Sequence, residues 1–386
     1  MEGKQEPSRR RAMTIFSPGT PEECANTIRE AASLGCKLAV QGNRSWMQVD
    51  GERFLHTRRL DTVTELSARD LVVTVSAGVS WTDLQQTLKE SGVWIALDVP
   101  GHNRTVGSVV ATGTSGPLRL GFGDIRDHLL GMTFVTGHGR IVRSGGSVMK
   151  NVAGFDLRRM NTGAFGAFGV LTEVSLRLRS LPKVDRTMLV DGERDLLVKA
   201  ANKLLNKGVI PAALEVISPS ITQRPNWVLA LRVLGGERRV ESEFKRCRLE
   251  ELGPPDGMNA QATSSLWQNV LESTTQQPTV LRIGSNPTEA TSVLAALDQH
   301  LGGDHITYNP QYGIRWCGSC EAESLVALRA RLFDLDVPVT VERAEWKFLN
   351  KVGFFGPLRN GVQNIVSALK TAFDPMSVFA VSDVVG

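Results

Sequence analysis

The chain has 386 residues, of which 41% are hydrophobic and 22% are charged, and its formal net charge at pH 7 is +4. These values lie near the globular average, so they exclude a disordered chain or a fibre, and the length suits two domains or three. The charge is small for this length and forms no basic stripe with interleaved aromatic residues, which argues against a nucleic-acid partner. No segment approaches the ~20 apolar residues of a membrane span.

Residues 1–12 read as a flexible leader, with Pro and Ser beside the run Arg9-Arg10-Arg11. The leader lacks the apolar core of a secretory signal. Five cysteines, an odd number spread along the chain, argue against a disulfide framework. We therefore expect a cytoplasmic protein, with attachment to the inner membrane through partner subunits as an alternative.

The first helix is predicted from Pro21, capped by Thr20, to Gly35, and a buried strand follows over 37–40. That strand ends in Gly42-Asn43, two residues that tolerate a left-handed backbone, with Arg44 and Ser45 next. Such a turn is either ordinary strand punctuation or a nest of N–H groups that binds a phosphate. A second strand, a turn at Gly78 and a helix over 82–90 come next.

From Pro100 to Gly169 the chain is dense in glycine, in the stretches "DVPGHNRTVGSVVATGTSGP", "LGFGDIRDHLLG", "SGGSVMKNVAGFDL" and "NTGAFGAFGVLTEVSLRLRS". Glycine allows backbone N–H groups to approach a ligand closely. The density indicates either a long diphosphate-bearing ligand or a β-rich domain that needs many turns. Two standard nucleotide sites are excluded, because neither the Rossmann G-x-G-x-x-G pattern nor a Walker loop is present.

After Pro182 amphipathic helices alternate with strand-like runs at 213–217, 227–233, 280–283 and 337–341. This alternation predicts a sheet covered by helices, in a second domain that begins near residue 183. A last helix, "RNGVQNIVSALKTAFDP", precedes a short extended tail. Cys317 and Cys320 form a C-x-x-C pair at a strand–turn–helix corner, and without matching cysteines they read as structural.

Six stretches in order carry a resemblance: "AVQGNRSW", "VSAGVSWTDLQQTL", "PGHNRTVGSVVATGTSG", "GFGDIRDHLLG", "VMKNVAGFDL" and "GAFGAFGVLTEVSLRL". They resemble the FAD-binding domain of vanillyl-alcohol-oxidase/PCMH-type flavoproteins. Over 14–182 the chain is similar to the FAD-binding E subunits of bacterial glycolate oxidases. The resemblance implies an α+β fold, with a PCMH-type FAD-binding domain (13–182), a second α/β cap or partner-facing domain (183–345), and a C-terminal segment (346–386) that returns to the FAD domain.

The resemblance also implies non-covalent FAD and a set of contacts to it. The first loop would hold the diphosphate, although it has one glycine where family loops often have two or three. Covalent attachment through His102 is the less favoured alternative. The implied cofactor residues are Gln41, Gly42, Asn43, Arg44 and Ser45 in that loop, Gly101, Val106, Gly107 and Ser108 beside the diphosphate and flavin, Gly113, Thr114 and Ser115 along the isoalloxazine, and Gly169 and Val170 near the adenine.

No residue is assigned as catalytic, because the paired metal-binding histidines of related hydroxy-acid dehydrogenases are missing and no metal site is expected. Lys150, Asn151, Arg126 and Asp127 are polar residues in apolar surroundings, without an assigned role. The resemblance implies glycolate oxidation to glyoxylate in a complex with a D-type flavin subunit and an iron–sulfur subunit. Two alternatives stay open: a self-sufficient dehydrogenase of another hydroxy acid or alcohol, and a flavin-bearing structural subunit.

Overall fold

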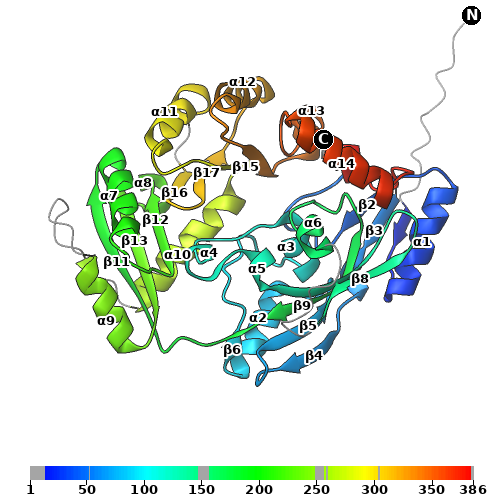
Figure 1. The fold of residues 1–386 in the computed structure, drawn as a ribbon, viewed down its shortest axis with the longest axis horizontal. Coiled ribbons are helices and arrows are strands. Elements are labelled where there is room, and N and C mark those ends of the chain that lie inside the picture. The colour runs from blue at the N-terminus through cyan, green and yellow to red at the C-terminus, as the bar shows by residue number, and fades with distance from the viewer. Residues whose placement is uncertain are drawn as a thin grey trace, which may run out of the picture.

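The computed structural model describes residues 14–51, 53–146, 156–247, 256–257, 260–302 and 305–383. The predicted leader (1–12), Lys150 and Asn151 lie outside these residues. Two bodies of structure lie side by side, one built from the first half of the chain and one from the second (Figure 1). The α+β fold class expected from the sequence is confirmed.

Two sheets form the first body. A three-stranded parallel sheet has the order β1 (Thr14–Phe16), β3 (Arg53–His56), β2 (Leu38–Gln41). A five-stranded antiparallel sheet has the order β4 (Val63–Ser67), β5 (Val72–Ser76), β9 (Val170–Arg177), β7 (Leu129–Val135), β8 (Ile141–Gly145). The helices are α1 (Pro21–Ser33), α2 (Trp81–Glu90), α3 (Val106–Thr112), α4 (Arg119–Phe122), α5 (Ile125–His128) and α6 (Leu157–Asn161), and β6 (Val93–Trp94) pairs with β10 (Arg179–Ser180).

Local sequence explains where these helices begin. Thr20 Oγ1 accepts a hydrogen bond from the Glu23 N–H at 3.1 Å, and Pro21 occupies the first turn, so α1 starts where the sequence predicts. Its apolar stripe, which includes Cys24 and Ile28, is buried. Ser80 caps α2 in the same way.

One eight-stranded antiparallel sheet organises the second body, in the order β14-β11-β13-β12-β16-β17-β15-β18. Its strands are β11 (Val184–Gly192), β12 (Ala213–Ile217), β13 (Trp227–Gly235), β14 (Asp256–Gly257), β15 (Thr279–Ile283), β16 (His305–Asn309), β17 (Gly313–Gly318) and β18 (Val339–Arg343). The helices are α7 (Arg194–Asn206), α8 (Pro219–Thr222), α9 (Glu237–Arg246), α10 (Ala260–Gln276), α11 (Ala290–His300) and α12 (Ala322–Phe333).

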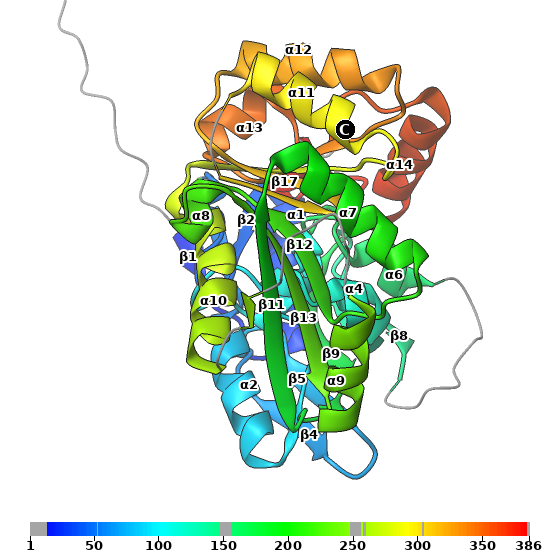
Figure 2. The same ribbon diagram turned by 90° about the vertical axis from the view of Figure 1, so that its left-hand side faces the viewer.

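The two faces of this sheet have different partners. Alternate residues such as Leu214, Leu229 and Leu231 share a core with α7, whereas Ala213 and Ala230 pack with α10 on the other face. Figure 2 shows α10 on the opposite side of β11 and β13 from α7 and α9. The sequence analysis did not predict helix α10 or strand β16, whereas the strand expected before the Cys317 corner is β17.

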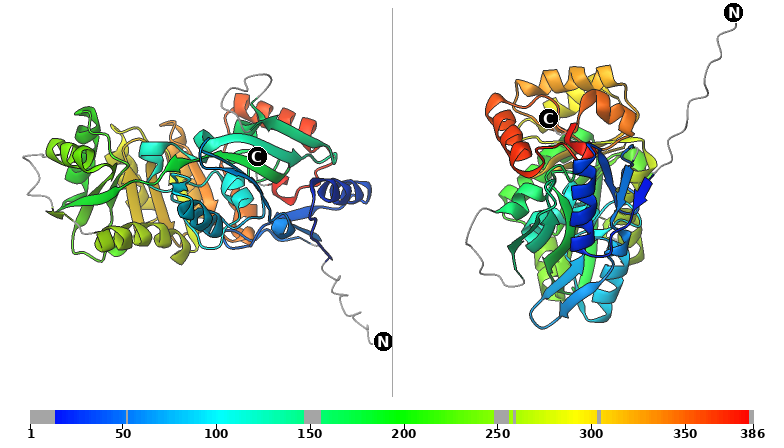
Figure 3. Two further views of the ribbon diagram at one scale, coloured as in Figure 1. Left: turned by 90° about the horizontal axis from the view of Figure 1, so that it is seen from below. Right: turned by 90° about the vertical axis from the view of Figure 1, so that its right-hand side faces the viewer.

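The C-terminal part, with α13 (Trp346–Val352) and α14 (Asn360–Phe373), runs back to the first body (Figure 3). The Leu38 N–H donates to Val378 O at 2.7 Å, and the Gly137 N–H donates to Phe373 O at 2.7 Å. The Asp374 carboxylate accepts from the Val378 and Phe379 N–H groups, which fixes the turn after α14. The domain limits at 182 and 345 stay predictions. In the described part of the chain, no helix is long and apolar enough to cross a membrane.

Candidate functional site

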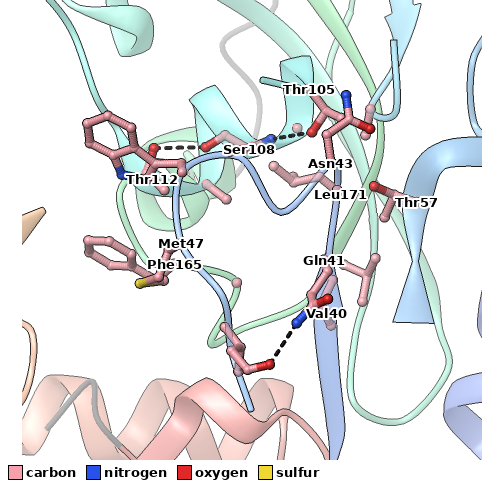
Figure 4. A pocket seen from close by; sticks show the side chains of 18 of the residues that line it. Val40, Gln41, Asn43, Met47, Thr57, Thr105, Ser108, Thr112, Phe165 and Leu171 are labelled. Atoms are coloured by element: carbon pink, nitrogen blue, oxygen red, sulfur yellow. Dashed lines mark hydrogen bonds between the residues drawn. The ribbon is translucent and has the colours of Figure 1, made fainter. Parts of the chain in front are cut away.

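A pocket opens where β2 ends, between the loop after it, the start of α3 and the segment before β9 (Figure 4). It contains about 770 Å³ of space free of protein atoms, part of it open to solvent. Of the residues predicted to contact a cofactor, nine line it: Gln41, Gly42, Asn43, Arg44, Ser45, Gly107, Ser108, Gly169 and Val170. Three segments far apart in the sequence therefore meet as one site.

The loop after β2 is held from both ends. Gln41 Nε2 donates to Val49 O at 2.6 Å, while Asn43 Nδ2 and Ser45 Oγ both donate to Asn103 O, at 2.9 and 3.0 Å. The positive φ expected at Asn43 occurs instead at Arg44, at 58°. Asn43 keeps a negative φ while its side-chain amide donates to Asn103 O and Oδ1.

The start of α3 is shaped by close packing. Thr105 Oγ1 caps the helix by accepting from the Ser108 N–H at 3.2 Å. A Cβ at Gly107 would lie 2.8 Å from Ala77 Cβ and 2.9 Å from Ala77 O. Gly107 thus allows α3 to approach the chain after β5 and so sets one wall of the pocket.

We expect Gly107→Ala to lower the free energy of unfolding by about 1–3 kcal/mol, because the new methyl group overpacks against the Ala77 backbone. Gly361→Ala in the exposed helix α14 is the matched control, since nothing lies within 4 Å of its Cβ. That control should be neutral or stabilising by up to about 1 kcal/mol. Denaturant unfolding of both variants measures the difference, and equal effects would contradict this account of Gly107.

Five other predicted cofactor residues do not line this pocket. Val106 lies in the core of the five-stranded sheet, and Gly101 sits against Trp46 and Arg104. Gly113 ends α3 at a φ of 62°, and Thr114 and Ser115 are buried behind it. Their contacts with a cofactor stay predictions. His102, whose side chain is 69% exposed, does not line the pocket; its Nε2 lies 3.8 Å from Glu272 Oε1.

Arg104 is a site residue that the sequence reading missed. It is 1% exposed, and its guanidinium donates to Pro100 O, Ser108 Oγ and Thr112 Oγ1 while it stacks 4.5 Å from the Trp46 ring. Burial lowers the pKa of Arg104 to about 9, and in the described residues no ion pair to a carboxylate is formed. A buried cation therefore lies directly behind Ser108 and Thr112, two pocket residues.

A second, smaller cavity lies between the two bodies. Gly116 and Arg119 of the first body face Glu215, Arg282, Asn309, Tyr312 and Arg315 of the eight-stranded sheet. Arg315 Nη2 donates to Ser115 O at 2.7 Å, which ties the sheet to the predicted flavin segment. Thr112 lines the first pocket and Gly116 the second, so one short segment borders both.

The carboxyl groups around this cavity differ in charge state. Burial raises the pKa of Glu215 to about 7 and that of Asp98 to about 6. Burial alone would raise the pKa of Glu342, but Arg315 and Arg282 hold it below its ordinary value. Asp98 Oδ1 accepts from the Leu118 N–H at 3.0 Å, whereas Oδ2 is buried without a hydrogen-bond partner among the described residues.

We expect Asp98→Asn to stabilise the protein at pH 8 but not at pH 4. The folded pKa of about 6 exceeds the ordinary value of 3.8, so the folded state favours the protonated acid, and stability falls as pH rises from about 4 to 6. Above pH 6 the ionised Asp98 lowers the free energy of unfolding by on the order of 3 kcal/mol, and asparagine, which carries no charge, removes this loss. Unfolding free energies at both pH values test this, and an equal effect at pH 4 and pH 8 would contradict it.

Cys317 is buried and Cys320 is half-buried, and both thiols are protonated at neutral pH. Burial raises the pKa of Cys317 to about 12 and that of Cys320 to about 11. Within the described ranges, no group of three or more His, Cys, Asp or Glu is placed to hold a metal ion. Arg126 and Asp127 are exposed; Asp127 closes a capping box with Asp124 at the start of α5.

Comparison with known proteins gives the cofactor of this part of the chain. Residues 13–145 match a family model described as an FAD binding domain. FAD is the cofactor of this protein. The whole fold is similar to that of an alkyldihydroxyacetonephosphate synthase, with a TM-score of 0.68 and 15% identity over 95% of this chain and 75% of that one.

Three curated relatives each match less than half of the chain. Glycolate oxidase subunit GlcE of Escherichia coli (strain K12) is 34% identical over 167 residues, which is 42% of this chain and 47% of that protein. A mitochondrial D-lactate dehydrogenase [cytochrome] of Arabidopsis thaliana is 36% identical over 31% of this chain and 21% of its own length. The D-2-hydroxyglutarate dehydrogenase of Xanthomonas citri pv. viticola is 27% identical over 46% and 39%. This chain thus spans less than half the length of each of these relatives.

The residues of the pocket fit FAD. Asn43, Ser45 and Ser108 offer polar groups beside the tight approach at Gly42, where a Cβ would lie 2.5 Å from Thr105 Oγ1. Gln41 Oε1 is buried without a protein partner among the described residues, as is Arg104 Nε next to the pocket. A polar, partly charged ligand with a slim diphosphate matches this combination better than an apolar one.

Proposed function

We propose that this chain is the FAD-binding subunit of a glycolate oxidase-like complex that oxidises a small 2-hydroxy acid, glycolate, to glyoxylate. The similarity to GlcE supports this proposal, as do the relatives whose names give D-lactate and D-2-hydroxyglutarate as substrates. Bound FAD supplies the hydride acceptor for such a reaction. The partners proposed are a D-type flavin subunit and an iron–sulfur subunit that receives the electrons.

The observation that carries the proposal is the position of the second cavity. It adjoins Ser115 and Gly116, which follow directly on the FAD pocket, and arginines from both bodies face it. A small organic acid needs cationic side chains near the cofactor, and this cavity supplies them. The absence of the metal-binding histidine pair from the sequence favours a subunit over a self-sufficient dehydrogenase.

The visible spectrum of the purified chain, loaded with FAD and kept free of oxygen, tests the function. We expect flavin bands that glycolate bleaches, with D-lactate and D-2-hydroxyglutarate compared at equal concentration. If only D-lactate or only D-2-hydroxyglutarate bleaches the flavin bands, that acid rather than glycolate is the substrate. Bands that stay oxidised with every acid, in the chain alone and with both partner subunits added, would favour a structural flavin-bearing subunit.

A further inference from the structure

We propose that Glu215 accepts the hydroxyl proton of the 2-hydroxy acid, whose carboxylate is bound by Arg119, in the cavity between the two bodies. The inference deepens the proposed function and rests on it. It names two residues for which the sequence reading found no role.

The position of Glu215 on its strand points it into this cavity. In β12, Leu214 and Val216 pack into the core on the α7 side, so Glu215 projects from the opposite face, part of which α10 covers at Ala213. The same alternation puts Asn309 of β16, Arg315 of β17 and Glu342 of β18 on that face, because Tyr308, Trp316 and Val341 belong to the core. The sheet therefore presents polar side chains to the FAD-binding body.

Glu215 is 5% exposed and is held in place by Asn309, whose Nδ2 donates to Glu215 Oε1 at 3.0 Å. It forms no ion pair in the described part of the chain, although it borders the cavity. A carboxyl group in this setting can hold or release a proton near neutral pH, which general acid–base work requires.

The arginines divide into two groups. Arg282 and Arg315 both pair with Glu342, at 3.0 and 3.3 Å, so their charge is partly compensated. Arg119 instead donates to Tyr312 O at 3.1 Å and stacks 3.8 Å from the Tyr312 ring, and among the described residues no carboxylate pairs with it. Arg119 is therefore the cation that remains for a substrate carboxylate.

Close packing brings Arg119 next to β12. The Gly121 N–H donates to Ala212 O at 3.1 Å, and a Cβ at Gly121 would lie 2.8 Å from Ala212 Cα. This contact joins α4 to the residue before β12, three positions from Glu215. A carboxylate anchor and a proton acceptor are thus held on two elements that touch.

The reaction balances with these groups. With FAD bound as the acceptor, the Cα–H bond would break and its electron pair would leave as a hydride, a two-electron reduction of the flavin. The O–H bond breaks and its proton passes to Glu215, while the C–O bond becomes the C=O bond of the 2-oxo acid. The substrate carboxylate stays on Arg119 and is unchanged.

The test compares Glu215→Gln and Glu215→Asp with the wild type, each loaded with FAD and without oxygen. We expect E215Q to keep its FAD and to bind oxalate, a stable acid of similar size, within about threefold of the wild type. Its rate of flavin reduction by glycolate should fall by about 100-fold or more, the usual contribution of a general base. E215D should recover part of the rate.

The pH profile separates a proton acceptor from a structural residue. The groups that face Glu215 are Asn309, Arg315, Arg119 and Asp98. The wild-type reduction rate should rise through about pH 7, where Glu215 loses its proton, and E215Q should lose this limb. A Glu215→Gln rate within threefold of the wild type at pH 8 would overturn the assignment of Glu215.

Oxalate binding tests Arg119 without any turnover. Arg119→Met should weaken binding at least tenfold, Arg119→Lys should restore part of it, and Arg186→Met on β11 is the control outside the cavity. If Arg119→Met binds oxalate as tightly as the wild type does, Arg119 does not bind the substrate carboxylate. This conclusion holds whether or not any 2-hydroxy acid reduces the wild-type flavin. If no 2-hydroxy acid reduces the wild-type flavin, the proposed function is wrong. The failure of the proposed function and the failure of the Arg119 assignment are therefore distinguishable.

Discussion

Ser45→Asp should reduce the affinity for FAD by about 100-fold relative to Ser45→Asn. Ser45 lines the first pocket, which we propose holds FAD, and is tied to Asn103 O through its hydroxyl. The resemblance assigns this loop to the diphosphate, and at an effective dielectric constant of about 20, like charges about 6 Å apart repel by about 3 kcal/mol. Aspartate and asparagine have nearly the same shape, so their difference isolates the charge.

Titration of the apoprotein with FAD, followed by flavin fluorescence, measures both affinities. The unfolding free energy of the two variants should agree within about 0.5 kcal/mol, because Ser45 is exposed. Affinities within threefold of each other would place the diphosphate away from the loop. The phosphate-binding interpretation of the turn would then be wrong, and Gln41–Ser45 would be ordinary strand punctuation.

Glu342→Gln should lower the free energy of unfolding by about 3 kcal/mol or more. Glu342 is 2% exposed and accepts from both Arg282 and Arg315, whose side chains are 40% and 13% exposed. Loss of the carboxylate leaves the buried Arg315 guanidinium uncompensated, which costs far more than the loss of a surface pair. Denaturant unfolding at pH 7 measures the effect.

Arg282→Gln is the matched control for this pair, because it removes the more exposed partner and leaves Glu342 bound to Arg315. It should cost about 1 kcal/mol or less. The pH dependence adds a check of sign: the lowered pKa of Glu342 means that its contribution is present above the ordinary carboxyl range and is lost as pH falls through the folded value. Equal costs for the two variants would show that the buried arginine is not the source of the effect.

Both effects concern the two cavities that flank the segment from Thr112 to Gly116. The loss of FAD affinity in Ser45→Asp is specific to the cofactor and should leave the fold intact. The loss of stability in Glu342→Gln concerns the contact between the eight-stranded sheet and the first body. Glu215 and Asp98 have the opposite effect to Glu342 on the pH dependence of stability, because their raised pKa values make the folded state more stable at acidic pH. A proton acceptor at Glu215 therefore carries a stability cost at neutral pH, as is usual for functional carboxyl groups.

Local signals predicted much of the fold. Thr20 and Pro21 predicted the start of α1, and the apolar runs predicted β12 at 213–217 with the bounds that the structure has. The helix α10 was missed because its sequence, "AQATSSLWQNVLESTTQ", is rich in Ser and Thr, which have modest helix propensity. Its burial of Trp267 against the sheet, rather than its propensity, accounts for its place.

The sequence by itself predicted the turn after β2, and its resemblance to PCMH-type flavoproteins indicated FAD, whereas glycine density alone left a ligand site and a turn-rich domain open. Only the tertiary structure decided the second cavity. Arg119, Glu215 and Arg315 are spread over nearly two hundred residues and follow no common motif. They meet because β-strand alternation turns the polar residues of β12, β16 and β17 to one face, and because Gly121 lets α4 pack against the start of β12. Contacts set by the packing of two separate bodies leave no spacing in the sequence from which they could be read.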